Sequence, residues 1–199
     1  MNSFRGPVLL AALSAFLGGC ISHPVKFDKA AYNVPQSGAT VSRTTSIVAV
    51  ITPETLAQKK TISAWMTGIA HKWDAEPGMM LKDVVEIEFP QAFGHHEISA
   101  SYAEPKTGDR RATVELSVPS YDFADFHATL TVHAIVYAPR QTKLLDKTYS
   151  AEGLRQGAKM FWAGAFGMKS AIRQSSLDAF KKVFAELRPD IEKALEAPR

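Results

Sequence analysis

The most regular hydrophobic pattern in the chain lies near its C-terminus. From about Met168 to Ala194, apolar residues recur at three- and four-residue spacings, which is the period of a helix that buries one face. The apolar positions are Ile172, Leu177, Ala179, Phe180, Val183, Phe184, Leu187, Ile191 and Leu195. Because Pro189 interrupts this pattern, we expect a long C-terminal helix with a kink there and a new short helix beyond it.

A second helical pattern runs from Met79 to Phe89, in the middle of the chain. Its apolar residues are Met80, Leu81, Val84, Val85, Ile87 and Phe89, and several of them are four apart. This spacing predicts an amphipathic helix that ends before Pro90, because proline disfavours helical geometry in the residue that precedes it. The second half of the segment also alternates between apolar and polar residues, which leaves a strand as the alternative.

Shorter apolar runs predict strands. Residues 46–52 are rich in β-branched side chains and predict a buried strand, and residues 61–66 are a weaker candidate for a second one. Residues 72–78 combine charged residues with proline and glycine, so we expect a turn between these elements and the mid-chain helix.

Two β-hairpins are expected in the second half of the chain. Residues 98–102 and 112–118 alternate on either side of a turn-rich stretch and predict the first hairpin. Residues 128–137 and 144–151 flank a turn that contains Pro139 and predict the second. In its first strand we expect one face on the core (Leu130, Val132, Ala134 and Val136) and the other towards water (Thr129, Thr131, His133, Ile135 and Tyr137).

These elements together predict an α+β fold in a single domain. Locally paired strands outnumber the helices, which favours a two-layer sandwich of a mostly antiparallel sheet with the mid-chain helix and the long C-terminal helix packed on one face. Residues 121–126 mix aromatic and acidic side chains and are interpreted as a loop between strands.

Composition narrows the class of protein. Hydrophobic residues make up 46% and charged residues 22% of the 199-residue chain, which is a globular balance with enough apolar material for a core. Lys and Arg number 23 against 20 Asp and Glu, and this small excess argues against a nucleic-acid-binding protein, which carries a clustered basic face. The single cysteine excludes a disulfide within the chain.

The first residues have the organisation of a secretory leader. Arg5 supplies the positive charge, and the apolar stretch from Val8 to Phe16 is too short to span a bilayer as a helix. The small residues Gly18 and Gly19 follow, and the only cysteine, Cys20, comes directly after them. We therefore predict a signal peptide over residues 1–19.

The end of this leader, Leu17-Gly18-Gly19-Cys20, resembles the lipobox of bacterial lipoproteins. The resemblance implies cleavage before Cys20, a diacylglyceryl group on its sulfur and further acylation of the new amine by chains such as palmitate. Several acyl chains form a stable membrane anchor, where one chain alone is marginal. Ile21 stands where inner-membrane lipoproteins of enteric-type bacteria carry Asp, which implies the outer membrane. An ordinary signal peptide with a coincidental cysteine is the alternative.

Residues 20–45 are interpreted as the lipidated N-terminus and a tether, and residues 46–199 as the domain. The stretch after the cysteine is rich in Pro, Ser and Thr and has little periodicity. Part of it is expected to pack against the domain, because Phe27 and Tyr32 would otherwise be exposed to water.

The order of elements is similar to that of small outer-membrane lipoproteins. A lipobox, an early strand, a mid-chain helix and a late hairpin that leads through a Gly-rich turn to a C-terminal helix resemble the auxiliary lipoproteins of ABC-type transport systems and the lipopolysaccharide-assembly lipoprotein. The matching stretch is Leu144 to Leu187, which includes Tyr149–Gly153 and Ser176–Phe180. The resemblance implies a non-catalytic role beside a transport or assembly machine and transfers no site residue.

Few residues suggest metal or cofactor chemistry. His95, His96 and Glu97 are metal-ligand types, but neighbouring histidines on a strand point to opposite faces, and no further ligand stands at a suitable spacing. We therefore expect an exposed loop there and no metal site. No Gly-rich phosphate loop is present either, so no cofactor is expected.

Two sets of residues bear on catalysis. Asp125 and His127 are two apart and share a face of a strand, and with His133 they form an acid–base or metal cluster or, as we expect, part of a polar sheet face. Ser175 and Ser176 lie on a predicted helix without a nucleophile-elbow sequence. We therefore predict that the protein is not an enzyme.

The stretch from Gly157 to Gly167 interleaves large apolar residues with small ones. Met160, Phe161, Trp162 and Phe166 either fill the core under the helix, with glycines allowing a tight turn, or form an exposed loop that contacts a partner or the membrane. Lys159, Lys169 and Arg173 accompany these residues and would suit an anionic surface.

The sequence predicts a lipoprotein that is anchored to the outer membrane through Cys20 and faces the periplasm. Its expected role is that of a non-catalytic accessory subunit that binds an envelope protein in transport or assembly. The alternative is a carrier or binding module for a lipid or another apolar small molecule, held between the sheet and the helices.

Overall fold

A computed structural model describes residues 21–32, 46–63, 71–93, 95–102 and 111–196, with the backbone alone for Ile21, Arg111, Arg140 and residues 158–166. The strands are β1 (Ile21–Val25), β2 (Ser46–Val50), β3 (Lys60–Ser63), β4 (His71–Ala75), β5 (His95–Ser99), β6 (Arg111–Ala124), β7 (His127–Ala138) and β8 (Thr142–Glu152). The α-helices are α1 (Pro53–Leu56), α2 (Pro77–Ala92) and α3 (Gly157–Glu196), and short 3-10 helices are formed by Lys29–Ala31 and Pro139–Gln141.

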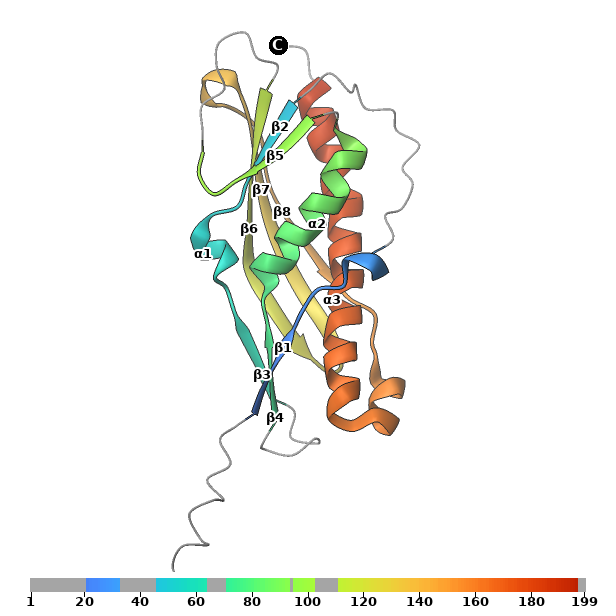
Figure 1. The fold of residues 1–199 in the computed structure, drawn as a ribbon. Coiled ribbons are helices and arrows are strands. Elements are labelled where there is room, and N and C mark those ends of the chain that lie inside the picture. The colour runs from blue at the N-terminus through green and yellow to red at the C-terminus, as the bar shows by residue number, and fades with distance from the viewer. Residues whose placement is uncertain (1–20, 33–45, 64–70, 94, 103–110, 197–199) are drawn as a thin grey trace, which may run out of the picture.

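The predicted α+β class is confirmed. A five-stranded sheet has the order β5-β2-β6-β7-β8, and a smaller three-stranded sheet has the order β1-β4-β3. Helices α2 and α3 lie side by side on one face of the larger sheet, and α3 packs against β7 and β8 (Figure 1). Both sheets are mixed, because β2 pairs in parallel with β5 and β6, and β1 pairs in parallel with β4.

The core lies between the five-stranded sheet and the two long helices. The predicted inner face of β7 is confirmed, since Leu130, Val132, Ala134 and Val136 are all 0% exposed. The helices contribute the apolar residues that the helical period predicted, among them Leu81, Val84 and Val85 of α2 and Ile172, Phe180, Leu187 and Ile191 of α3. Burial of these faces stabilises the fold at about 25 cal/mol per Å² of apolar surface.

The expected hairpin of residues 98–102 and 112–118 is wrong. Strand β2 lies between β5 and β6 and pairs with both in parallel. The reason is the composition of β2, whose residues Ile47 to Val50 are all buried. Such a continuous apolar strand is typical of the centre of a parallel arrangement, where both faces are covered. The second expected hairpin, β7–β8, is confirmed.

The expected turn at residues 72–78 is also wrong, because most of it is strand β4. β4 pairs with β1 on one side and β3 on the other, and Trp73 and Ala75 are 0% exposed. Pairing on two sides and burial of alternate residues therefore override the polar, turn-like composition. The weaker prediction of a strand over residues 61–66 is confirmed for residues 61–63, which belong to β3. Residues 64–66 lie outside the described residues.

The loop expected over residues 121–126 is almost entirely strand. β6 runs to Ala124, with a register shift between Ser117 and Ser120 that accommodates Pro119. Only Asp125 and Phe126 turn the chain, with φ of 46° and 60°. Positive φ at both central residues is the geometry of a two-residue hairpin whose twist matches its strands. A positive φ is unusual for a bulky residue such as Phe126.

Helix α2 is confirmed, and the strand alternative for its second half is wrong. The helix is longer than expected at both ends: Pro77 stands in its first turn, where the missing N–H costs nothing, and Pro90 lies exposed in its last turn. Gly78 is needed at the start of α2, because a Cβ there would lie 1.7 Å from the carbonyl oxygen of Thr55 in α1.

Helix α3 begins earlier and continues further than expected. The Gly-rich turn predicted for Gly157–Gly167 is helical, and no separate short helix begins at Pro189, which is exposed and lies within α3. Each glycine costs a helix about 1 kcal/mol relative to alanine, but the Ala, Met and Lys residues between the glycines are good helix formers. Burial of Leu187 and Ile191 on either side of Pro189 holds the last turns in place.

Residues 21–32 belong to the fold and are not a free tether, and residues 33–45 lie outside the described residues. Val25 is 2% exposed and Tyr32 is 4% exposed, and the Phe27 ring packs edge-on against Phe180 of α3. The Tyr32 hydroxyl donates a 2.8 Å hydrogen bond to Glu88 of α2. These contacts confirm that Phe27 and Tyr32 pack against the domain.

Candidate functional site

The end of the fold that follows Cys20 is the first candidate, because the sequence predicts a membrane anchor there. Ile21, the residue after Cys20, is already paired with His71 in the β1–β4 ladder. Asp74 of β4 accepts hydrogen bonds from Ser22 of β1 and Thr61 of β3. One carboxylate thus connects all three strands of the small sheet, and these bonds lower the pKa of Asp74 below its ordinary value.

Two histidines face each other on the other side of this small sheet. The Nε2 atom of His23 and the Nδ1 atom of His71 are 3.0 Å apart, and both rings lie against the fully buried ring of Trp73. The ring centroids are 5.3 Å apart, so the two nitrogens point almost directly at each other. This is the geometry of one imidazole N–H donating to the other ring, and it joins β1 to β4.

The candidate apolar residues lie at the start of α3. Met160, Phe161, Trp162 and Phe166 fall on its helical backbone, and their side chains lie outside the described part. Whether they are core or surface therefore stays a prediction. The connection that leads into this helix exposes Leu154, which is 60% accessible. Apart from Met79 at 38%, it is the only exposed large hydrophobic residue in the described ranges.

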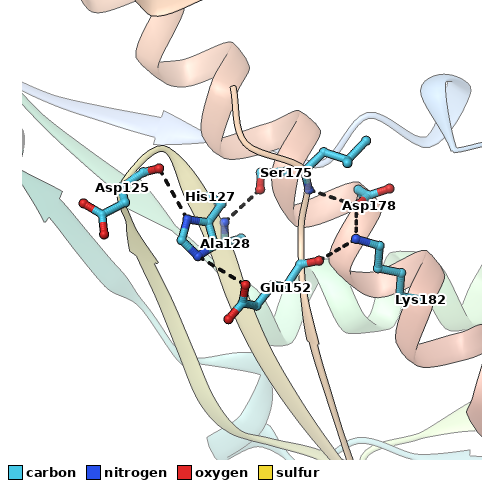
Figure 2. Close-up of polar contacts among 8 residues, drawn as sticks. Asp125, His127, Ala128, Glu152, Ser175, Asp178 and Lys182 are labelled. Atoms are coloured by element: carbon cyan, nitrogen blue, oxygen red, sulfur yellow. Dashed lines mark hydrogen bonds and ion pairs between the residues drawn. The ribbon is translucent and has the colours of Figure 1, made fainter. Parts of the chain in front are cut away.

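The connection around Leu154 is well held. The Leu154 N–H donates to Asp178 of α3 at 2.9 Å, and the Gln156 N–H donates to the carbonyl oxygen of Phe126 at 2.9 Å. Lys182 bridges Asp178 and the carbonyl oxygen of Glu152 (Figure 2). The exposed leucine is thus presented on a backbone fixed to both the helix and the β6–β7 turn.

The second candidate is the polar cluster around His127. Its Nδ1 atom lies 3.3 Å from the backbone carbonyl oxygen of Asp125, and its Nε2 atom lies 3.7 Å from a carboxylate oxygen of Glu152. The Asp125 carboxylate points away from the imidazole (Figure 2). His133 is six residues further along β7, which is about 20 Å, and it pairs with Asp146 at 2.8 Å. The residues considered as an acid–base cluster are therefore not assembled into one.

The two serines have structural partners. Ser175 is 0% exposed, and its Oγ accepts the N–H of Ala128 at 2.8 Å (Figure 2). Ser176 donates to the carbonyl oxygen of Ile172 at 2.7 Å and is hydrogen-bonded to the Tyr121 hydroxyl at 2.8 Å. Burial raises the pKa of Tyr121 to about 12. These hydroxyls join α3 to β6 and β7.

Gly153 explains why α3 approaches β8 so closely at this point. A Cβ on Gly153 would lie 1.9 Å from the backbone carbonyl oxygen of Ser175 and 2.4 Å from its Oγ. The Gly153 N–H donates to the backbone carbonyl oxygen of Ala128 at 2.8 Å, so β7, α3 and the β8–α3 connection meet at this glycine.

The possible metal ligands His95, His96 and Glu97 are exposed on β5, an edge strand, and not on the loop that was expected. Within the described ranges, no group of three or more His, Cys, Asp or Glu residues is placed to hold a metal ion. Nor does any helix in those ranges combine the length and apolar character needed to cross a membrane.

Sequence reasoning missed a buried ion pair between the two long helices. Arg188 of α3 donates to Glu88 of α2 at 2.8 Å, and the exposed side-chain fractions are 8% and 2%. Glu88 also accepts the Tyr32 hydroxyl. The sequence did contain a sign that Glu88 is buried, because it is four residues from Val84 and three from Val85 and so lies on the apolar face of α2.

No protein-family model matches this chain. No curated protein matches it either. Two solved structures resemble it distantly. One, described as an uncharacterized protein, has a TM-score of 0.43 and 10% identity, with 85% of this chain and 97% of that chain covered. The other, the hypothetical protein CT253 from Chlamydia trachomatis, has a TM-score of 0.40 and 8% identity, with 77% of this chain and 99% of that chain covered.

Proposed function

We propose that this protein is a lipoprotein, acylated on Cys20 and held on the outer membrane with its domain in the periplasm. Its role is that of a non-catalytic accessory subunit that binds a partner in envelope transport or assembly. The observation that carries the proposal is the position of β1, whose first residue follows the candidate lipidated cysteine directly.

Two further observations support a binding role over chemistry. The polar side chains that were considered for catalysis join β6, β7, β8 and α3 through hydrogen bonds, and Ser175 contacts a backbone N–H. The apolar residues that were considered for binding stand on α3 next to the exposed Leu154. An exposed apolar side chain such as that of Leu154 favours association with another surface.

The test is purification of the natively acylated protein from membranes in mild detergent, with Cys20→Ala as the control. We expect an acyl mass on Cys20 in the wild-type chain and stoichiometric envelope proteins that copurify with it. Bound lipid without a protein partner would favour the carrier role instead. A wild-type protein without acyl mass would contradict the proposal.

A double substitution tests the binding surface. Phe161→Ser with Trp162→Ser is expected to weaken association with the membrane or with the partner while thermal stability is retained. Met79→Ser is the matched control, because Met79 is an exposed apolar residue of another helix, α2. A loss of about 3–5 kcal/mol in the double variant would instead place both rings in the core.

A further inference from the structure

We infer that the end of the domain formed by the β8–α3 connection rests on the surface of the membrane that carries the Cys20 lipid. The inference depends on the proposed acylation of Cys20 and adds a fixed orientation: α3 rises from the membrane and its C-terminal end faces the periplasm. The partner of this surface is a phospholipid bilayer, recognised by apolar and cationic side chains.

Very little chain separates the proposed lipid from the fold. Cys20 directly precedes Ile21, the first paired residue of β1, so a single peptide unit with a Cα–Cα span of about 4 Å joins the proposed lipidated residue to the fold. Strand β1 cannot move away from the domain, because it is paired with β4 and its Val25 is buried. The acyl chains therefore enter the bilayer directly beside the start of β1, with no spacer.

Other elements lie at the same end of the molecule as the start of β1. The start of β1, the β8–α3 connection and the first turns of α3 all lie at one end of the molecule, at the bottom of Figure 1. The C-terminal end of α3 and the β7–β8 turn lie at the opposite end. A 40-residue helix extends up to about 60 Å, so a lipid at one end brings only that end to the bilayer.

The β8–α3 connection exposes an apolar and a cationic residue side by side. Leu154 is 60% exposed on a backbone held by Asp178, so its side chain faces water without a packing partner in the fold that would cover it. Arg155 follows it and is exposed. A membrane-surface contact combines apolar and cationic residues in this way. The apolar side chain enters the boundary of the acyl chains, and the cation contacts lipid phosphates.

The test uses the natively acylated protein with one fluorescent probe. The chain has a single cysteine, which the lipid occupies, so Leu154→Cys provides one thiol for an environment-sensitive dye. Thr142→Cys is the matched control, because Thr142 is exposed at the start of β8, beside the β7–β8 turn. Each labelled protein is reconstituted into vesicles of phosphatidylethanolamine and phosphatidylglycerol that contain a nitroxide-labelled lipid.

We expect the probe at 154 to shift its emission to the blue and to be quenched roughly twofold or more relative to the probe at 142, since interfacial side chains enter the headgroup region. Equal emission and quenching at both positions would overturn the inference. So would a blue shift at 154 that needs envelope proteins as well as lipid, because that result assigns the surface to a protein partner.

Failure of the proposed function gives a different result. A chain without acyl mass would not float with the vesicles at all, and both proposals would then fall together. If the chain floats with the vesicles but both probes are exposed to water, the proposed anchor holds and only the proposed orientation is wrong.

Discussion

The buried contact between Glu88 and Arg188 allows the sharpest prediction about stability. Both side chains lie between α2 and α3, and the Glu88 carboxylate accepts two hydrogen bonds of 2.8 Å, one from Arg188 and one from Tyr32. Glu88→Ala removes the acceptor of both. It also leaves a guanidinium that is 8% exposed without this counter-charge.

The expected cost follows from these contacts. A hydrogen bond to a charged group contributes roughly 1.5–3 kcal/mol, and removal of one partner of a buried ion pair typically costs about 3–5 kcal/mol. We therefore expect Glu88→Ala to lower the free energy of unfolding by about 4 kcal/mol. With a denaturant slope near 2 kcal/mol per M, the midpoint of urea unfolding should fall by about 2 M.

A double substitution separates the ion pair from simple packing. Replacing both Glu88 and Arg188 by methionine removes the two charges together and keeps most of the volume. It leaves the buried Tyr32 hydroxyl without this acceptor, so its cost should be about 1–3 kcal/mol, below that of Glu88→Ala. Lys82→Ala is the control on the same helix, because its pair with Glu86 is partly exposed and should contribute less than about 0.5 kcal/mol. A Glu88→Ala variant as stable as the Lys82→Ala variant would refute the reasoning.

Other predictions concern the contacts of the small sheet and of α3. Gly153→Ala should lower the thermal midpoint more than Ser175→Ala, because its Cβ would lie 1.9 Å from a backbone oxygen, whereas loss of the Ser175 hydroxyl leaves one buried N–H unpaired at about 1–3 kcal/mol. Equal midpoints would argue against a close approach at this glycine. The pKa of Asp74 is lowered in the folded state, so its stabilising effect is present above the unfolded value near 4 and is lost as pH falls further. The protection of the β1 amides from hydrogen exchange, relative to their intrinsic exchange rates, should therefore fall in acid in the wild-type protein, and Asp74→Asn should lack this pH dependence. The pKa of Tyr121 is raised to about 12, so stability should fall between pH 10 and 12 as the unfolded chain ionises first, and Tyr121→Phe should reduce that fall in urea titrations.

Local pattern was sufficient for several parts of the molecule. The helical period of α3 and of α2, the alternation along β7 and the β7–β8 hairpin all depend on residues that are close in the chain, and the structure confirms each of them. Leu130 to Val136 illustrate the reason: a two-residue period commits alternate side chains to one face, whichever strand lies beside it.

The candidate site was predicted only in part. The apolar residues at the start of α3 were identified from composition, but the exposed Leu154 was not, because a single leucine in a polar connection has no periodicity to reveal it. The contacts of Ser175 were also invisible, since they depend on a strand 47 residues away.

The sequence by itself determined the leader pattern that ends at Cys20, the α+β class, the faces of the two long helices and one hairpin. Tertiary structure alone decided that β2 separates β5 from β6, that residues 71–75 form a strand, and that residues 21–32 join the core. It also brought Glu88 together with Arg188, 100 residues away. The physical reason is that periodicity is a local property, whereas strand neighbours and buried charge pairs depend on which distant surfaces close on one another.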